Sequence, residues 1–294
     1  MSDALELLRH APCGYRDGST PAAEPTALAA LALLGANRFG DAQPHLQWLS
    51  AHQAHDGCVP PLGDLNQPGW PTPLAIVAFA AANHDNATAT VNFDTEAAKR
   101  YLLSISGKTL EPSPQYGHNG QLVGWPWVDG THSWQEPTAT AVLALKSIGL
   151  WDHPRTREGV RLLIDRLLVT GGCNYGNTVV LGQKLRPHVE PTGIALVAIA
   201  GEKSDDPRVD RSVQYLLGAL NNETTPISLS YGLLGLAAHD HFPDQASNWL
   251  EAAFRHVKYK QPSPLDVALL VLAAQGSECP LITLTKSPSV AAVT

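Results

Sequence analysis

The chain has 294 residues, a net charge of −7 and 16% charged residues against 44% hydrophobic ones. The charged fraction lies below the roughly 25% of an average soluble domain, which favours a protein with a large interior. A groove that follows a phosphate backbone needs clustered Lys and Arg, and the sequence contains no such cluster, which excludes nucleic acid as a partner.

The first residues carry acidic side chains and no long apolar run, which argues against a secretory signal or a transit peptide. No stretch reaches the roughly 18 apolar residues that span a bilayer. We therefore expect a cytoplasmic protein, and a peripheral contact with a membrane stays open. Four isolated cysteines without a C-x-x-C pair are typical of reduced thiols rather than of a disulfide scaffold.

Six segments of the chain share one plan: a proline, usually followed by threonine, and then a nearly continuous run of Ala, Leu, Val and Ile. Proline is favoured in the first turn of a helix, because its missing N–H would be unpaired there. Each run is therefore predicted to be a helix that starts at its proline, and its apolar surface on all sides predicts burial on both faces. The repeat segments that contain these predicted inner helices occupy residues 24–35, 70–81, 136–147, 190–201, 225–236 and 263–274.

The segments between them have apolar residues at three- and four-residue spacing and charges on the opposite face, which predicts surface helices. These predicted outer helices occupy residues 3–8, 41–53, 94–105, 153–168, 206–220 and 243–258. Alternating outer and inner helices predict an all-α fold, an (α/α)6 toroid. It would form one domain, residues 1–276, followed by a tail of residues 277–294. An open solenoid is the structural alternative, but the terminal hairpins lack the polar outer faces that its end caps need.

The loops from outer to inner helices contain most of the Gly and Trp residues. They include QAHDGC from Gln53, GWPWVDGTHSW from Gly124 and GGCNYGN from Gly171. Over nearly its full length the chain resembles the squalene cyclase and protein prenyltransferase repeat family, whose Q-x-x-D-G-x-W loop these segments match in degenerate form. The resemblance implies an α/α toroid with an axial pocket as its working site.

In family cyclases of the protonation type, the proton donor is an Asp two residues before a Thr at the start of an inner helix. Glu136, followed by Thr138, matches that position. The family's D-x-D-D motif is absent, and the Asp, Cys and His zinc ligands of the prenyltransferases have no counterparts at matching positions. The resemblance therefore implies no metal and no other cofactor for this chain.

Glutamate precedes the proline of three predicted inner helices, at Glu24, Glu136 and Glu190. In a ring of six, Glu136 and Glu190 are neighbours, and Glu24 lies across the axis from Glu190. Burial or a neighbouring like charge raises the pKa of a carboxylic acid, so these residues are the candidate acid and base. Aromatic faces stabilise cations. His132 and His188 are candidate assisting residues, and the candidate substrate-binding residues are Trp70, Trp125, Trp127, Trp134, Tyr15 and Tyr175.

The main hypothesis is a terpenoid-cyclase-like enzyme. It would bind a small isoprenoid in the axial cavity, and Glu136 would protonate an alkene or epoxide to start cyclisation of the class II type.

Four alternatives stay open. The glutamates could be structural helix-start residues, and the toroid could bind a lipid or protein without catalysis. The same carboxylates could serve a glycan hydrolase or lyase. His188 with Glu190, or His132 with Glu136, could bind a metal. An apolar cavity would favour isoprenoid chemistry, an open polar cleft a sugar, and a filled axis a scaffold.

Overall fold

The computed structural model describes residues 1–10, 12–63, 68–84, 91–260 and 262–286. The inner helices are α2 (Ala23–Gly35), α4 (Thr72–His84), α6 (Gln135–Ser147), α8 (Val189–Ile199), α10 (Pro226–Ala238) and α12 (Pro264–Ala274). The outer helices are α1 (Ser2–Leu8), α3 (Phe39–Ala51), α5 (Thr95–Ser104), α7 (Pro154–Asp165), α9 (Pro207–Ala219) and α11 (Ala246–Lys260). The remaining elements are η1 (Pro114–Tyr116), β1 (Val179–Val180), β2 (Gln183–Lys184), η2 (Gly276–Glu278) and α13 (Pro280–Thr283).

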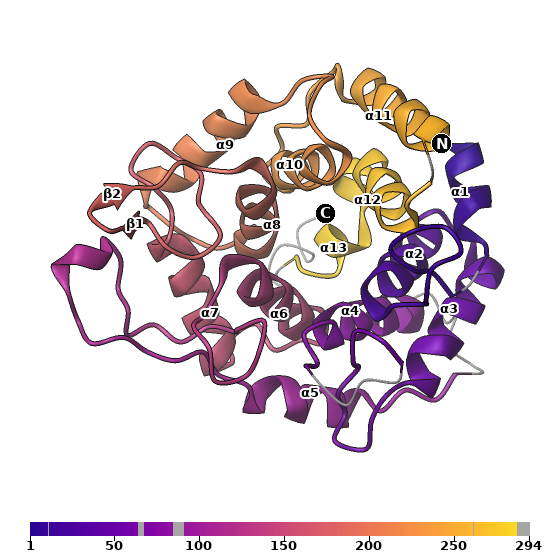
Figure 1. Ribbon diagram of the computed structural model, residues 1–294, viewed down its shortest axis with the longest axis horizontal. Coiled ribbons are helices and arrows are strands. Elements are labelled where there is room, and N and C mark those ends of the chain that lie inside the picture. Colours follow the sequence, from indigo (N-terminus) through magenta and orange to yellow (C-terminus); the bar gives the residue numbers. More distant parts are fainter. Residues whose placement is uncertain (11, 64–67, 85–90, 261, 287–294) are drawn as a thin grey trace.

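The helices form a closed double ring (Figure 1). Each inner helix contacts the next one in chain order, and α12 returns to contact α2. The outer helices surround this ring, and α1 packs against α12 where the two ends of the chain meet. The predicted all-α toroid is therefore confirmed, and an open solenoid is excluded.

The prolines of the repeat lie where the inner helices begin. Helices α10 and α12 begin at Pro226 and Pro264, whereas α2, α6 and α8 begin two residues before their prolines. Helix α4 begins one residue after Pro71. The first N–H groups of a helix have no partner within it, so a proline fits anywhere in this turn. The predicted helix starts are thus correct to within two residues.

The threonines of the repeat fasten each loop to the inner helix that follows it. In four repeats the threonine hydroxyl accepts a hydrogen bond of 2.9–3.1 Å from the backbone N–H of a loop residue. Buried backbone groups need such partners. The pairs are Thr26 with Cys13, Thr72 with Val59, Thr138 with Trp125, and Thr192 with Cys173. The recurrence of threonine is therefore structural.

Two loop glycines let the loops pass close to the next outer helix. Gly57 and Gly171 have φ angles of +93° and +91°, in the region that favours glycine. A Cβ at either position would lie 2.2 Å from backbone atoms, of Ala97 in α5 and of Arg211 in α9 respectively. The glycines of the Q-x-x-D-G-like segments thus serve packing.

Helices α8 and α10 approach each other more closely than side chains would allow. A Cβ on Gly193 would lie 2.1 Å from the backbone oxygen of Tyr231, and one on Gly235 would lie 2.9 Å from Gly193. Close backbone approach of this kind requires glycine. The contact fixes α10 against α8 and so determines where the Tyr231 side chain lies.

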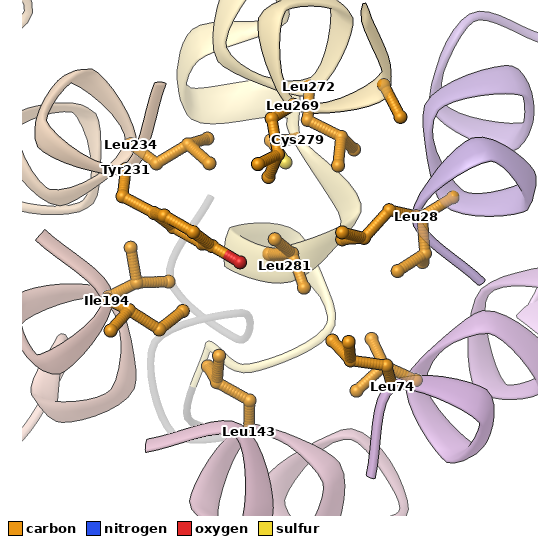
Figure 2. Packing of buried hydrophobic residues seen from close by; sticks show 14 of the residues in the cluster. Leu28, Leu74, Leu143, Ile194, Tyr231, Leu234, Leu269, Leu272, Cys279 and Leu281 are labelled. Carbon is orange, nitrogen blue, oxygen red and sulfur yellow. The ribbon is translucent and has the colours of Figure 1, made fainter. Parts of the chain in front are cut away.

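The axis of the ring is filled by the segment after α12. Figure 2 shows Leu281 of α13 at the centre, among Leu28, Leu74, Leu143 and Ile194 of the inner helices. Leu281 is 1% exposed and Cys279 is fully buried. The sequence-based expectation of an axial cavity is wrong at this depth. The segment PLIT is too short to show helical periodicity, so its packing inside the ring was not foreseen.

All four cysteines are free and buried, in agreement with the expected thiols. Within the described part of the chain, no helix combines the length and the apolar character needed to cross a membrane.

Candidate active site at the mouth of the ring

Three glutamates lie in the first turns of inner helices, at the end of the ring where these helices begin, which we call the mouth. They are Glu24 of α2, Glu136 of α6 and Glu190 of α8. Because α6 contacts α8, and α2 is three helices away from α8 in the closed ring, their predicted relative order is the one observed. Each glutamate is half-buried, so water still reaches it. We call these three residues the acidic cluster.

The acidic cluster has perturbed acidities. Burial raises the pKa of Glu136 to about 8, and the nearby charges of Glu24 and Glu190 contribute. Burial also raises the pKa of Glu24 to about 7, opposed by a hydrogen bond from Tyr15 and reinforced by Glu190. The pKa of Glu190 is raised by burial and held down by His188. Near neutral pH, Glu136 therefore keeps its proton, which makes it the candidate acid of the cluster, and Glu190 is the candidate base.

Two predicted tyrosines lie at the rim of the acidic cluster. The Tyr15 hydroxyl donates a hydrogen bond of 2.8 Å to Glu24. Burial raises the pKa of Tyr175, and the charges of Glu190 and Glu136 add to this effect. The Tyr175 ring lies 5.1 Å from the ring of His188, which caps α8. With 39% and 42% of their surface exposed, Tyr15 and Tyr175 can stack against a ligand.

Tyr231 of α10 joins the cluster from below, and the sequence analysis missed it. Its side chain is 3% exposed and its hydroxyl points toward the axis in Figure 2. Burial raises its pKa strongly, and the charges of Glu136, Glu24 and Glu190 all add to this. The available signal was a lone aromatic residue in an aliphatic inner helix, followed by a glycine.

Three of the predicted tryptophans lie elsewhere. Trp125 is 2% exposed, its indole N–H donates to the carbonyl of Leu102 at 2.8 Å, and the Arg155 guanidinium covers its ring at 4.2 Å. It is a core residue. Trp70 and Trp127 pack edge to face at 5.1 Å and line a small pocket between α4, α5 and α6. The expectation that these three belong to one axial wall is wrong, because their loops turn outward between hairpins.

The last two predicted site residues, Trp134 and His132, face different parts of the structure. Trp134 caps the start of α6, and Gly176 lies against its ring, which places it beside the Tyr175 segment. His132 is exposed and lines a different cleft, of about 800 Å³, between the loops that precede α6 and α8. None of the three glutamates lines that cleft. The assistance that His132 would give to Glu136 thus stays a prediction.

The acidic cluster is not arranged as a metal site. Among the described residues, no three His, Cys, Asp or Glu side chains are placed to hold one metal ion together. The pairs His188 with Glu190 and His132 with Glu136, considered from the sequence, therefore lack a third ligand of these types within that part of the chain.

A closed double ring of helices with acidic residues at one end defines the chain as an α/α toroid protein. No family model matches the sequence, and no curated protein matches it. Solved structures match its fold. A novel α-amylase from Clostridium perfringens has a TM-score of 0.60 at 14% sequence identity, and the match covers 87% of this chain and 87% of that one.

An inactive variant of an α-1,6-mannanase from Salegentibacter sp. HEL1_6, in complex with α-1,6-mannotriose, has a TM-score of 0.56 at 12% identity. This match covers 95% of this chain and 99% of that one. An α2-macroglobulin fragment from Escherichia coli matches with a TM-score of 0.49 at 15% identity, over 94% of this chain and 42% of that one. At such identities, the first two likenesses show the fold and identify no family.

Proposed function

We propose that the chain is a glycoside hydrolase that cleaves a glycan at the mouth of the ring. Glu136 is the general acid that protonates the leaving oxygen, and Glu190 is the carboxylate that acts as base or nucleophile. The observation that carries the proposal is the set of three glutamates with raised pKa values in the first turns of inner helices, at one end of the ring.

The division of roles follows from the surroundings of the two glutamates. Glycoside hydrolysis needs one carboxylic acid that keeps its proton and one carboxylate that is ionised. Glu136, with a pKa of about 8, keeps its proton near neutral pH. Burial raises the pKa of Glu190 as well, but the nearby His188 opposes this rise, and no such opposing charge acts on Glu136. Different surroundings for two neighbouring acids are typical of acid–base pairs.

The rim of the acidic cluster suits a sugar. The rings of Tyr15 and Tyr175 are exposed, and each has a hydroxyl group beside its apolar face. Sugars present both apolar C–H faces and hydroxyls, so such residues can stack and hydrogen-bond at once.

The structural comparisons support the proposal without identifying the substrate. Two of the similar toroids are named as an α-amylase and an α-1,6-mannanase. The mannanase structure is that of an inactive variant in which two aspartates are replaced by asparagine. Carboxylates therefore matter for activity in a toroid of this shape.

The isoprenoid cyclase hypothesis is supported less well. It requires an apolar chamber along the axis, and Leu281 and Cys279 occupy part of that space. A toroid that only binds a partner would explain the filled axis. It gives no reason for three glutamates at one end of the ring that form no ion pair with a Lys or Arg of the described residues.

The test is hydrolysis of a panel of α- and β-linked oligosaccharides, followed by mass spectrometry of the products. We expect wild-type protein to cleave at least one of them and Glu136→Gln to lose about 100-fold or more in rate. Glu251→Gln, on the exposed face of α11, is the matched control and should keep full activity. Undiminished cleavage by Glu136→Gln would refute the acid assignment. Cyclisation of linear prenyl substrates, with every glycan left intact, would overturn the proposal.

A further inference from the structure

A cleft of about 800 Å³ opens between the loop that contains η1 and the hairpin β1–β2, which lies outside the ring of inner helices (Figure 1). Cavities that hold small ligands measure about 300–1,000 Å³, so this one has room for more than a single sugar ring. Its two walls are joined, because the Thr178 hydroxyl donates a hydrogen bond of 2.9 Å to the carbonyl of Tyr116. A Cβ on Gly117 would lie 2.6 Å from the Val179 side chain. The cleft is therefore a preformed feature of the fold.

The walls of the cleft combine neutral polar groups with aliphatic side chains. Among the described residues that line it, none is Asp, Glu, Lys or Arg. A charged ligand would therefore find no opposite charge there. Amide, phenol and imidazole groups can exchange hydrogen bonds with sugar hydroxyls, and aliphatic side chains can contact the C–H faces of a sugar. The polar groups belong to Gln115, Tyr116, His132 and Asn177, and the aliphatic ones include Val180 and Leu181.

The turn of the hairpin is a second observation that points to a ligand. Leu181 and Gly182 form this two-residue turn, with φ angles of +49° and +74°. Turns of this type favour Asn, Asp or Gly at both places, because a bulky side chain is strained at positive φ. Leu181 is 97% exposed, so packing within the chain does not offset the strain. An apolar side chain held in this way at the edge of a cleft indicates contact with a bound molecule.

The cleft and the mouth of the ring share the same pair of loops. His132 lies in the loop that leads to Glu136, and Asn177 follows Tyr175 by two residues. The backbone N–H of Gln135 donates a hydrogen bond of 2.9 Å to the carbonyl of Tyr175, which joins the two loops next to the start of α6. A chain molecule bound in the cleft can therefore continue to the mouth.

Resting on the proposed glycoside hydrolase function, we propose that the cleft binds the distal sugars of an uncharged glycan chain while one glycosidic bond lies at the mouth. The side chains of His132 and Asn177 hydrogen-bond the hydroxyls of these sugars, and Leu181 covers a C–H face. The enzyme therefore prefers long neutral chains to disaccharides and to charged glycans.

The first experiment measures binding by isothermal titration calorimetry. The probes are dextran, soluble starch, an α-mannan and a mixed-linkage β-glucan, each compared with its carboxymethylated form, which is anionic. We expect at least one neutral polymer to bind, and its carboxymethylated form to bind at least about tenfold more weakly. Oligosaccharides of the bound polymer, from dimer to heptamer, should then gain at least about tenfold in affinity with length.

The second experiment repeats the titrations with two cleft variants, Asn177→Ala and Leu181→Gly. Glycine suits the positive φ of the turn, so Leu181→Gly should keep the unfolding midpoint of the wild type. Each variant should bind the heptamer about five- to tenfold more weakly and leave affinity for the dimer unchanged. Tyr259→Ala, which removes a 91% exposed side chain on α11, is the control and should change neither affinity. Circular dichroism checks that each variant is folded.

Three results would overturn the inference: no binding of any neutral polymer, equal affinity for the carboxymethylated form, or full affinity for the heptamer in both cleft variants. Length-dependent binding that the cleft variants lose, without cleavage by the wild type, would support the inference and overturn the proposed hydrolase function. Cleavage at a rate that depends neither on chain length nor on the cleft variants would support the hydrolase and overturn the inference.

Discussion

Replacing Glu136 by glutamine should make the protein more stable at alkaline pH. The folded protein raises the pKa of this carboxyl from 4.5 to about 8, mainly by burial. The folded state therefore binds a proton more tightly than the unfolded chain does. Stability from this group is fully present below about pH 4.5 and is lost as pH rises through about 8. Glutamine has no proton to lose, so the variant escapes this loss.

The size of the effect follows from the shift. At about 1.36 kcal/mol per pKa unit, the full shift would correspond to about 5 kcal/mol. Because water still reaches the half-buried side chain, screening reduces this, and we expect ~2–3 kcal/mol. The wild-type protein should lose that much more free energy of unfolding than Glu136→Gln does between about pH 5 and about pH 9.

Urea unfolding followed by circular dichroism measures this difference at the two pH values. Glu251→Gln is the control, because Glu251 is exposed on α11, and its pH dependence should match that of the wild type. If Glu136→Gln lost as much stability on alkalinisation as the wild type, Glu136 would not be the buried acid described above. The proton donor of the proposed mechanism would then have to be another residue.

Two further predictions concern the fold. Thr138→Val removes the hydroxyl that accepts a hydrogen bond from the backbone N–H of Trp125, and it should lower the free energy of unfolding by about 1–3 kcal/mol. Thr170→Val, on an exposed loop, should have little effect. Equal unfolding midpoints in urea would contradict the fastening role of the threonine. Leu281→Ala should destabilise by about 2–5 kcal/mol by leaving a cavity on the axis. Leu181→Ala is the control, because Leu181 is 97% exposed. If Leu281→Ala lost no more free energy of unfolding than Leu181→Ala, the axis would not be closely packed around Leu281.

The ring could be predicted from the sequence because its signals are local and repeated. A proline followed by an aliphatic run marks each inner helix, and the charged segments between mark the outer ones. Closure follows from six such pairs, and the starts of the inner helices differ from the predicted prolines by at most two residues.

The filling of the axis could not be predicted, because it depends on four residues, Pro280–Thr283, whose partners come from helices throughout the chain. Tyr231 was missed for a similar reason. An aromatic residue in an apolar run is normally core, and only the folded chain brings Tyr231 near enough to the acidic cluster for the three glutamates to raise its pKa.

The positions of the loop tryptophans were predicted wrongly for a different reason. Composition indicates that a loop is rich in aromatic rings, but whether a ring turns toward the axis or between hairpins depends on tertiary contacts. Trp125 turns away because the carbonyl of Leu102 accepts its indole N–H. Tyr15 stays at the mouth because its hydroxyl donates to Glu24.

The repeats themselves separate structure from function in the acidic cluster. Threonine follows the proline in four repeats and in each one binds the preceding loop. The residue before the proline varies within the same ring. It is glutamate three times, but tryptophan in the repeat of α4, threonine in α10 and serine in α12. Since α4 forms the same helix with Trp70 in that place, glutamate is not needed to start an inner helix. Among the described residues, the carboxylates of Glu136 and Glu190 accept no hydrogen bond that would hold a loop. The described fold thus gives these two carboxylates no structural partner, which is consistent with the proposed role at the mouth.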